Sequence, residues 1–286
     1  MPELPEVETI RLGLEKYLVG KKIEDVEVRL PKMVTGDTKN IIGAKVKDVK
    51  RFGKGLVIDL DNGYSIAAHI KLTGQFIYEG TEETVGTKVS KKVGGKLPNK
   101  WTHVIFKLKA QKSNLKSYLY YNDIRQFGWI KILKSAHVKD LPFFKELGPE
   151  PFKDLTFDIF EKIVKRSSVA IKPLLMDQKK IGGVGNIYAN DGLFEARIDP
   201  RRKAKTLTDT EIKQLYESIL KVLKKGLENG GASELNYVNA LGQEGKYQHH
   251  FLAYGRQNQK CFRGDGVMKK ITLGGRGTYF CEKCQK

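Results

Sequence analysis

The hydrophobic pattern of this chain changes its period near residue 150. Before that point, apolar residues alternate with other residues, as at Leu56, Ile58 and Leu60 and again over 104–108, and this alternation is typical of strands. After it, apolar residues recur at helical spacing over 159–164 and over 212–223, the second run following a Thr208-x-x-Glu211 capping box. Since one element cannot follow both periods, the change predicts a β domain followed by a helical domain.

Turn-forming residues indicate where these domains end. Pro142 and the segment 147–151, which contains Gly148 and two prolines, interrupt the chain between the two patterns, and Gly230-Gly231 ends the last helical run. We therefore expect an α+β multidomain protein. Its N-terminal antiparallel β-sandwich covers residues 1–134, a linker 135–150, a helical domain 151–232, and a small β-hairpin region 233–286. A helix flanks the sandwich at the N-terminus, because Val7, Ile10 and Leu14 recur at helical spacing.

Proline at position 2 gives the N-terminus distinctive chemistry. Removal of Met1 would expose a secondary amine on Pro2. An α-amino group titrates at about 8, against about 10.4 for a lysine side chain, so more of it is neutral at pH 7. Attack of such an amine on a sugar C1′ would give an iminium, or Schiff-base, intermediate, and Glu3 and Glu6 can share one helix face beside it. The same residues also suit an ordinary helix start, because proline favours the first turn and acidic residues complement the helix dipole.

The net charge indicates a polyanionic partner. Lys and Arg number 52 against 33 Asp and Glu, which gives +19 at pH 7, and this balance favours nucleic acid over an anionic membrane surface. The sequence has no apolar run of about 18 residues that could span a bilayer. The N-terminus matches neither a signal peptide nor a transit segment. We therefore expect a cytoplasmic protein without a membrane partner.

Five segments, taken together and in this order, resemble the formamidopyrimidine-DNA glycosylase family, whose relatives include endonuclease VIII. They are Pro2-Glu3-Leu4-Pro5-Glu6, Arg51-Phe52-Gly53-Lys54, His69-Ile70-Lys71-Leu72-Thr73-Gly74, Asp123-Ile124-Arg125-Gln126-Phe127-Gly128 and Gly183-Val184-Gly185-Asn186-Ile187-Tyr188-Ala189. The resemblance covers nearly the whole chain. It implies a helix–two-turn–helix in the helical domain and, at the C-terminus, a lesion loop followed by a zinc-ribbon-like finger. One departure is Asp191, where the family usually has Glu.

The resemblance also implies a role for individual residues. Pro2 would be the nucleophile, Glu3 would protonate the opening sugar ring, and Glu6 would position the amine. Contacts to DNA phosphates would come from Lys54, His69, Asn186 and Arg276. Extruding a base from a duplex costs a few kcal/mol, which inserted side chains offset in part, and these side chains would be Leu72, Arg125 and Phe127. We expect Arg125 and Phe127 to lie on a strand, where two residues that are two positions apart point the same way. Leu72 stands where the family has Met. Without the resemblance, the sequence favours sheet core for Leu72 and a structural histidine for His69.

The C-terminal cysteines depart from the family pattern of two Cys-x-x-Cys pairs around zinc. Cys281 and Cys284 form one intact pair, but Cys261 is followed by Gly264 where the second ligand of the other pair belongs. Structural zinc takes four ligands. We expect one zinc ion on Cys261, Cys281 and Cys284, completed by Asp265, His249, His250 or water; the alternative is a ribbon that holds no metal.

The resemblance as a whole implies a bifunctional DNA glycosylase and AP lyase of base excision repair. It would excise oxidised purines, namely 8-oxoguanine and formamidopyrimidines, through a Pro2 Schiff base with β,δ-elimination. Its partner would be damaged double-stranded DNA, and a monomer is the family expectation. Two alternatives stay open: an endonuclease VIII-like glycosylase for oxidised pyrimidines, and a damaged-DNA-binding protein without catalysis.

Overall fold

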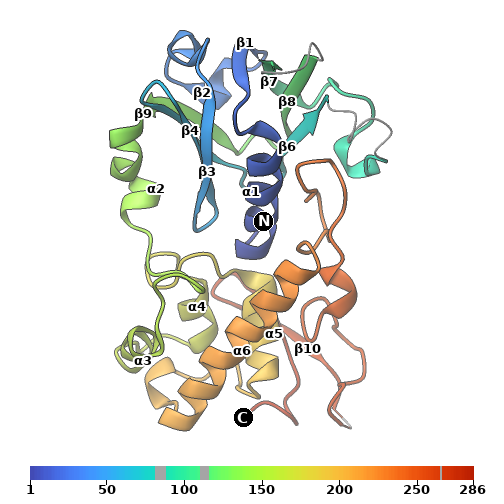
Figure 1. Ribbon diagram of the computed structural model, residues 1–286. Coiled ribbons are helices and arrows are strands. Elements are labelled where there is room, and N and C mark those ends of the chain that lie inside the picture. Colours follow the sequence, from blue (N-terminus) through green and yellow to red (C-terminus); the bar gives the residue numbers. More distant parts are fainter. Residues whose placement is uncertain (81–87, 110–115, 265) are drawn as a thin grey trace. The chain divides into compact units, whose positions relative to one another are not determined.

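The computed structural model describes residues 1–80, 88–109, 116–264 and 266–286, and these form two compact units (Figure 1). Met1–Lys145 and Asn229–Gln248 make up the first unit, and Glu146–Glu228 and His249–Lys286 the second. The segment Asn229–Gln248 therefore belongs to the β unit, whereas we expected it to be divided between the helical domain and the hairpin region.

The first unit is a two-sheet sandwich with helix α1 (Leu4–Leu18) packed on it (Figure 1). One sheet has the order β1-β7-β8-β6, with bounds Lys22–Val28, Thr102–Lys109, Lys116–Asp123 and Gly74–Glu79. The other has the order β2-β9-β5-β4-β3, with bounds Val34–Thr35, Trp129–Lys134, Tyr64–His69, Gly55–Leu60 and Val46–Phe52. Among the described pairings only the two-residue strand β2 is parallel to its neighbour, β9. The expected antiparallel sandwich is confirmed.

The core of this unit explains both periodicities of its sequence. Val7 and Leu14 of α1 are fully buried and share one apolar cluster with strand residues such as Leu56 and Phe106. The neighbouring Val57 of β4 faces the opposite way, into a second cluster with Val138 and others. Because apolar residues cover both faces of β4, this strand is buried on both sides.

The expected linker 135–150 is partly packed structure. It contains the 3₁₀ helix η5 (Ser135–Asp140) and helix α2 (Pro142–Lys145), and the buried side chains of Val138 and Phe144 contact the outer face of the second sheet. Burial of these apolar side chains outweighs the turn signal of Pro142. The described residues of the first unit also form the short 3₁₀ helices η1 (Pro31–Met33), η2 (Thr38–Ile41), η4 (Lys91–Val93) and η7 (Tyr247–His250), the last ending in the second unit.

The second unit is built around helix α5. Its helices are α3 (Phe157–Lys165), α4 (Ile171–Met176), α5 (Asn186–Glu195) and α6 (Asp209–Glu228), with the 3₁₀ helix η6 (Ala204–Thr206). Two glycines let α5 and α6 pack closely: a Cβ on Gly192 would lie 2.3 Å from Ile219, and one on Gly226 would lie 2.5 Å from Tyr188. The expected capping box of α6 is confirmed, because the Thr208 N–H donates to Glu211 Oε2 (2.8 Å).

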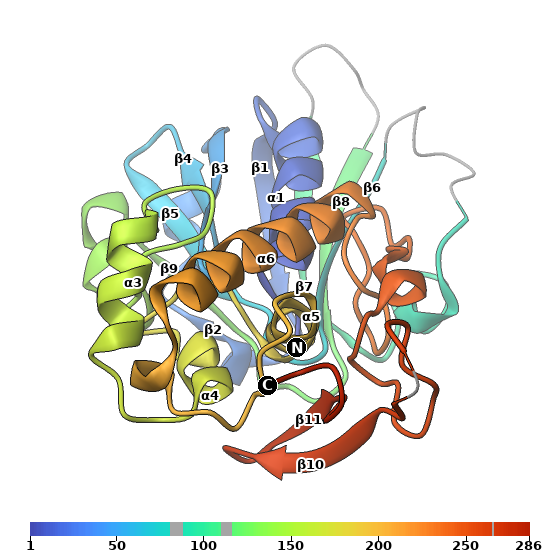
Figure 2. The same cartoon turned by 90° about the horizontal axis from the view of Figure 1, so that it is seen from below.

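A β-hairpin completes this unit, as Figure 2 shows. Strands β10 (Lys269–Leu273) and β11 (Arg276–Phe280) pair antiparallel, with Leu273 opposite Arg276. The two residues between them, Gly274 and Gly275, have φ of +57° and +72°, a conformation of tight hairpins that favours glycine. The expected hairpin is confirmed although Gly264 replaces a cysteine. Across the described residues, none of the helices has the length and hydrophobicity needed to cross a bilayer.

Candidate functional site

The start of α1 is a buried polar arrangement centred on Glu6. Pro2 and Glu3 are buried, and Glu6 is only 1% exposed. One carboxylate oxygen of Glu6 accepts the backbone N–H of Glu3 (2.7 Å), and the other accepts the N–H of Ala232 (2.8 Å). Glu6 therefore fixes the first turn of the helix against a segment more than 200 residues away. With Met1 present, the Pro2 nitrogen is an amide; it stands in for the amine that Met1 removal would free.

An ion pair links this helix to the turn that carries Lys54. Glu8 accepts from Arg51 Nε (2.9 Å) and from Arg11 Nε (2.8 Å). Arg51 also donates to the carbonyl oxygen of Gly53 (2.9 Å). Lys54, which is 3% exposed, follows in the turn between β3 and β4. No sequence pattern indicated the pair of Glu8 and Arg51, because only the folded topology brings these two distant residues together.

His69, at the end of β5, is a neutral buried side chain. It is 3% exposed, and the ring of Phe143 lies 4.6 Å away in an edge-on arrangement. Burial lowers the pKa of His69 to about 3, and the positive charges of Lys71 and Lys54 add to this. Since Nδ1 accepts the N–H of Lys71 (2.9 Å), the ring proton sits on Nε2. His69 can therefore donate one neutral hydrogen bond, although it carries no charge for a phosphate.

Arg125 and Phe127 lie on a loop, and our interpretation of this segment as a strand was wrong. Strand β8 ends at Asp123, β9 begins at Trp129, and Gln126 between them has φ of +56°. The two side chains nevertheless come together, because the Arg125 guanidinium lies 4.8 Å from the centre of the Phe127 ring. Both residues are exposed, Phe127 at 54%. An apolar ring and a cation are therefore presented side by side to solvent.

Asp123 holds this loop against the one that carries Leu72. The Asp123 carboxylate is fully buried and accepts from the Thr73 hydroxyl, from the N–H of Arg125 (3.2 Å) and from the N–H of Gly128 (2.8 Å). Leu72, next to Thr73, is half-buried and is absent from the apolar core clusters of the described residues. The structure thus brings the loops of Leu72, Arg125 and Phe127 together.

In the second unit, a buried lysine links Asn186 to the hairpin. Lys172 is 0% exposed, and its ammonium donates to Asn186 Oδ1 (2.7 Å), Thr278 Oγ1 (2.8 Å) and the carbonyl oxygen of Gly277 (3.0 Å). Asn186 begins α5, and Arg276, the residue before Gly277, is exposed beside the hairpin turn. A helix N-terminus and an exposed arginine suit an anion such as phosphate. No pattern in the sequence indicated this role of Lys172.

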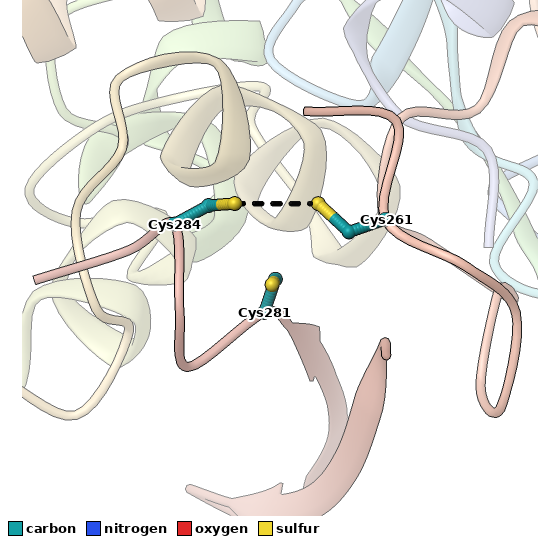
Figure 3. Close-up of side chains that lie close together, drawn as sticks. All are labelled: Cys261, Cys281 and Cys284. Atoms are coloured by element: carbon teal, nitrogen blue, oxygen red, sulfur yellow. Dashed lines mark hydrogen bonds between the residues drawn. The ribbon is translucent and has the colours of Figure 1, made fainter. Parts of the chain in front are cut away.

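Three cysteines of this unit converge, as Figure 3 shows. The sulfur atoms of Cys261, Cys281 and Cys284 all lie within 4.8 Å of one another, and those of Cys261 and Cys284 are 3.5 Å apart. Thiolates at such distances suit a tetrahedral thiophilic metal. Among the described residues no histidine or carboxylate joins this group, so His249 and His250 are not part of it. Asp265 lies outside the described residues.

The cysteines do not titrate alike. Burial works against ionisation of Cys281, but N–H groups of Cys284 and Lys283 and the Cys261 side chain outweigh it, so the pKa of Cys281 is lowered. Burial and the other two sulfurs raise the pKa of Cys284 to about 11. Without a cation, three adjacent thiolates repel one another, and a divalent ion would remove that penalty.

The departure at Asp191 has a local structural role. The side chain is fully buried, and its Oδ1 accepts the backbone N–H groups of Ala253 (2.9 Å) and Tyr254 (3.0 Å). Asp191 thus connects α5 to the segment that leads into the cysteine centre.

Comparison with known proteins gives matches over nearly the full length. Residues 1–130 match the formamidopyrimidine-DNA glycosylase N-terminal domain, and residues 147–236 match the formamidopyrimidine-DNA glycosylase H2TH domain. The chain is 41% identical to the formamidopyrimidine-DNA glycosylase of Pelotomaculum thermopropionicum, over 100% of this chain and 99% of the relative. The enzyme of Streptococcus mutans is 38% identical over 100% of both.

Solved structures give the same result. The chain is similar to the Lactococcus lactis protein Fpg in complex with a DNA containing an abasic site, with a TM-score of 0.86 and 32% identity over 99% of each chain. A mutant of that protein bound to a DNA containing Fapy-dG gives the same TM-score and identity over 100% of each chain.

Proposed function

The chain belongs to the formamidopyrimidine-DNA glycosylase family and is a DNA glycosylase of base excision repair; from this premise we propose that it removes oxidised purines and then cuts the strand as an AP lyase. The observation that carries the proposal is the buried start of α1, where Pro2 adjoins Glu3 and a Glu6 whose carboxylate is bound by two backbone N–H groups. The resemblance of its N-terminal segment, of Arg125 and of Phe127 favours 8-oxoguanine and formamidopyrimidines.

The proposed chemistry begins once Met1 is removed. The neutral Pro2 amine attacks C1′ of the extruded nucleotide and forms a C–N bond, while the glycosidic bond breaks and the base leaves. Glu3 protonates the ring oxygen as the sugar opens. The resulting iminium makes the C2′ proton acidic, so its removal expels the 3′ phosphate by β-elimination, and δ-elimination then releases the 5′ phosphate. Glu6 acts by position, because its carboxylate accepts the backbone N–H groups of Glu3 and Ala232 and so fixes the first turn of α1.

We propose that the DNA partner is a damaged duplex gripped through its phosphates. Lys54, His69, Asn186 and Arg276 would each contact a phosphate, and the formal charge of +19 would attract the duplex as a whole. Exposed Phe127 with Arg125, and Leu72, would occupy the place of the extruded base. We expect the protein to act as a monomer.

We also propose that the cysteine centre binds one zinc ion. Zinc would stabilise the ribbon, since binding a metal to thiolates contributes to folding free energy. Metal analysis of the purified protein tests this directly.

Borohydride trapping on damaged DNA tests the function. Protein whose Met1 removal is verified by mass spectrometry should form a covalent adduct with a duplex carrying 8-oxoguanine opposite C, and Pro2→Gly should not reproduce it at the normal rate. No adduct with any lesion would favour a damaged-DNA-binding protein. A normal adduct in Pro2→Gly that disappears only when a lysine is removed would contradict the proline mechanism. Preference for thymine glycol over 8-oxoguanine would favour the endonuclease VIII-like specificity.

A further inference from the structure

We propose that Thr73 is a positioning residue for base extrusion. Its hydroxyl ties the loop of Arg125 and Phe127 to the loop of Leu72, so that these three side chains enter the duplex as one unit. The inference rests on the proposed function, which assigns the three side chains to the place of the extruded base. Thr73 itself is buried, at 8% exposed, and therefore acts through its neighbours.

The Thr73 hydroxyl makes two hydrogen bonds, and both go to the segment that carries Arg125. It donates to Asp123 Oδ1 and accepts the backbone N–H of Arg125 (3.0 Å). These partners are 50 and 52 positions away in the chain. A hydrogen bond from a hydroxyl to a carboxylate is stronger than one between neutral groups, and burial strengthens it further. The Thr73 side chain is thus a direct bridge between the two loops.

The Asp123 carboxylate closes the loop on the Arg125 side. It is 0% exposed, and it accepts the N–H of Arg125 through Oδ1 (3.2 Å) and the N–H of Gly128 through Oδ2 (2.8 Å). The backbone of Asp123 is held in turn, since its carbonyl oxygen accepts from His103 Nε2 (2.8 Å). Both ends of the loop are therefore fixed by one side chain, and Thr73 bonds to that same side chain.

The loop on the Leu72 side is closed by its own backbone. The N–H of Gly74 donates to the carbonyl oxygen of Ile70 (2.8 Å). Lys71 has φ of +50°, which is uncommon for a residue with a side chain, and its N–H donates to His69 Nδ1 (2.9 Å). Leu72 lies inside this turn, so a displacement of the turn moves Leu72 and Thr73 together.

Both loops also pack on the hydroxyl group of Tyr121, which is 0% exposed. A Cβ added to Gly74 would lie 2.7 Å from the Tyr121 hydroxyl oxygen, and one added to Gly128 would lie 1.8 Å from it. The two glycines therefore let both loops lie directly against one buried group. Tyr121 limits movement of the loops toward the sheet, and the Thr73 hydroxyl limits movement of one loop relative to the other.

Such a fixed arrangement has a consequence for base extrusion. Loops that become ordered only when they enter the duplex lose conformational entropy at that step, whereas loops that are already fixed avoid this cost. Thr73→Val keeps the shape of the side chain but removes both hydrogen bonds of the hydroxyl. We expect this variant to insert its side chains into DNA more slowly, although Leu72, Arg125 and Phe127 are all present.

Stopped-flow fluorescence of 2-aminopurine measures insertion without any chemical step. The full-length protein, in excess, is mixed with a duplex that carries an uncleavable abasic analogue and a neighbouring 2-aminopurine, whose fluorescence changes when its stacking is disturbed. With Thr73→Val this change should be at least about tenfold slower than with the wild type. Thr73→Ser keeps the hydroxyl and should stay within about twofold of the wild type. If Thr73→Val does not fold, Thr73→Ala gives the same test with the same expected slowing.

Thr102→Val is the matched control. The Thr102 hydroxyl is also buried, donates to Asn122 Oδ1 (2.8 Å) and accepts the N–H of Asn99 (2.9 Å), and these two partners lie outside both loops. Thr102→Val should lose stability in urea as Thr73→Val does, yet insert at the wild-type rate. Equal slowing in the two valine variants would show a general loosening of the sandwich and would overturn the inference.

A second background tests whether Thr73 acts through the loop of Phe127. In Phe127→Ala, the further change Thr73→Val should slow insertion by less than about threefold, because the loop then carries less to position. An undiminished effect there would show that Thr73 acts elsewhere and would overturn the inference.

Borohydride trapping on a cleavable abasic duplex keeps the inference apart from the proposed function. A wild type that gives the fluorescence change but no adduct would overturn the proposed lyase activity alone. A normal wild-type adduct, with an unchanged insertion rate in Thr73→Val, would overturn the role of Thr73 alone. A wild type that gives no fluorescence change would overturn both the inference and the proposed insertion of Leu72, Arg125 and Phe127.

Discussion

Replacing Lys172 with methionine tests whether this buried lysine holds the second unit in its binding geometry. Methionine keeps the length and apolar stem of the side chain but removes an ammonium that donates to Asn186, Thr278 and Gly277 at 2.7–3.0 Å. Hydrogen bonds to charged groups contribute about 1.5–3 kcal/mol each. Part of this sum is offset by the several kcal/mol needed to bury the ammonium. We therefore expect Lys172→Met to lower the free energy of unfolding by about 3 kcal/mol.

The variant should also weaken DNA binding, since Asn186 and the hairpin next to Arg276 lose their common partner. The loss should be equal for all sequences, because phosphate contacts do not read bases. Urea unfolding measures the first effect, and fluorescence anisotropy with two unrelated damaged duplexes measures the second. Lys213→Met on the exposed face of α6 makes the same charge change and should stay within about 0.5 kcal/mol of the wild type. A Lys172→Met protein as stable as Lys213→Met would refute this reasoning and would mean that the buried charge adds nothing over an apolar side chain.

Three other predictions follow from the first unit. Between pH 8 and pH 5 the free energy of unfolding of the wild type should fall by about 2 kcal/mol more than that of His69→Gln. The histidine of the unfolded chain gains a proton near pH 6.5, whereas the buried one, with a pKa of about 3, does not. Parallel stability profiles of the two proteins against pH would contradict this. In urea unfolding, Glu6→Gln should be about 1–3 kcal/mol less stable than the wild type. The control Glu15→Gln, at a side chain that is 43% exposed, should change the stability little. Equal losses of stability in the two variants would contradict a special role of the buried Glu6 carboxylate. Phe127→Ala should be as stable as the wild type, since the Phe127 side chain is 54% exposed. In single-turnover assays it should cleave a damaged duplex about tenfold more slowly, because the extruded base loses a side chain that fills its place. A clear loss of stability instead would assign Phe127 to the core.

The elements that could be predicted from the sequence are those defined by local patterns. The helical spacing of Val7, Ile10 and Leu14 predicted α1, the Thr208–Glu211 box predicted the start of α6, and the paired glycines 274 and 275 permitted the hairpin. Each pattern lies within one or two turns of chain, so its physics does not depend on the rest of the fold.

The parts that could not be predicted depend on contacts between distant residues. Glu6 and Ala232 are 226 positions apart, and Arg51 and Glu8 are 43 apart; nothing in either local sequence marks the partner. The two-residue spacing of Arg125 and Phe127 suggested a strand, whereas the positive φ of Gln126 and the hydrogen bonds to Asp123 that form the loop arise only in the folded unit. The sequence therefore could not predict which polar side chains hold the site residues in position, and only the structure identifies them.

The hairpin that carries Arg276 can tolerate the loss of a metal ligand because its main supports lie elsewhere. Lys172 donates to Gly277 and Thr278, and Asn190 of α5 accepts the backbone N–H of Tyr279 (2.8 Å). These bonds connect the middle of β11 to α4 and α5, and none of them involves a cysteine. A Cβ added to Gly264, by contrast, would meet no described heavy atom within 4 Å. The hydrogen bonds that hold the hairpin therefore do not depend on the residue at position 264, so the departure from the family pattern there is compatible with the proposed phosphate contact of Arg276.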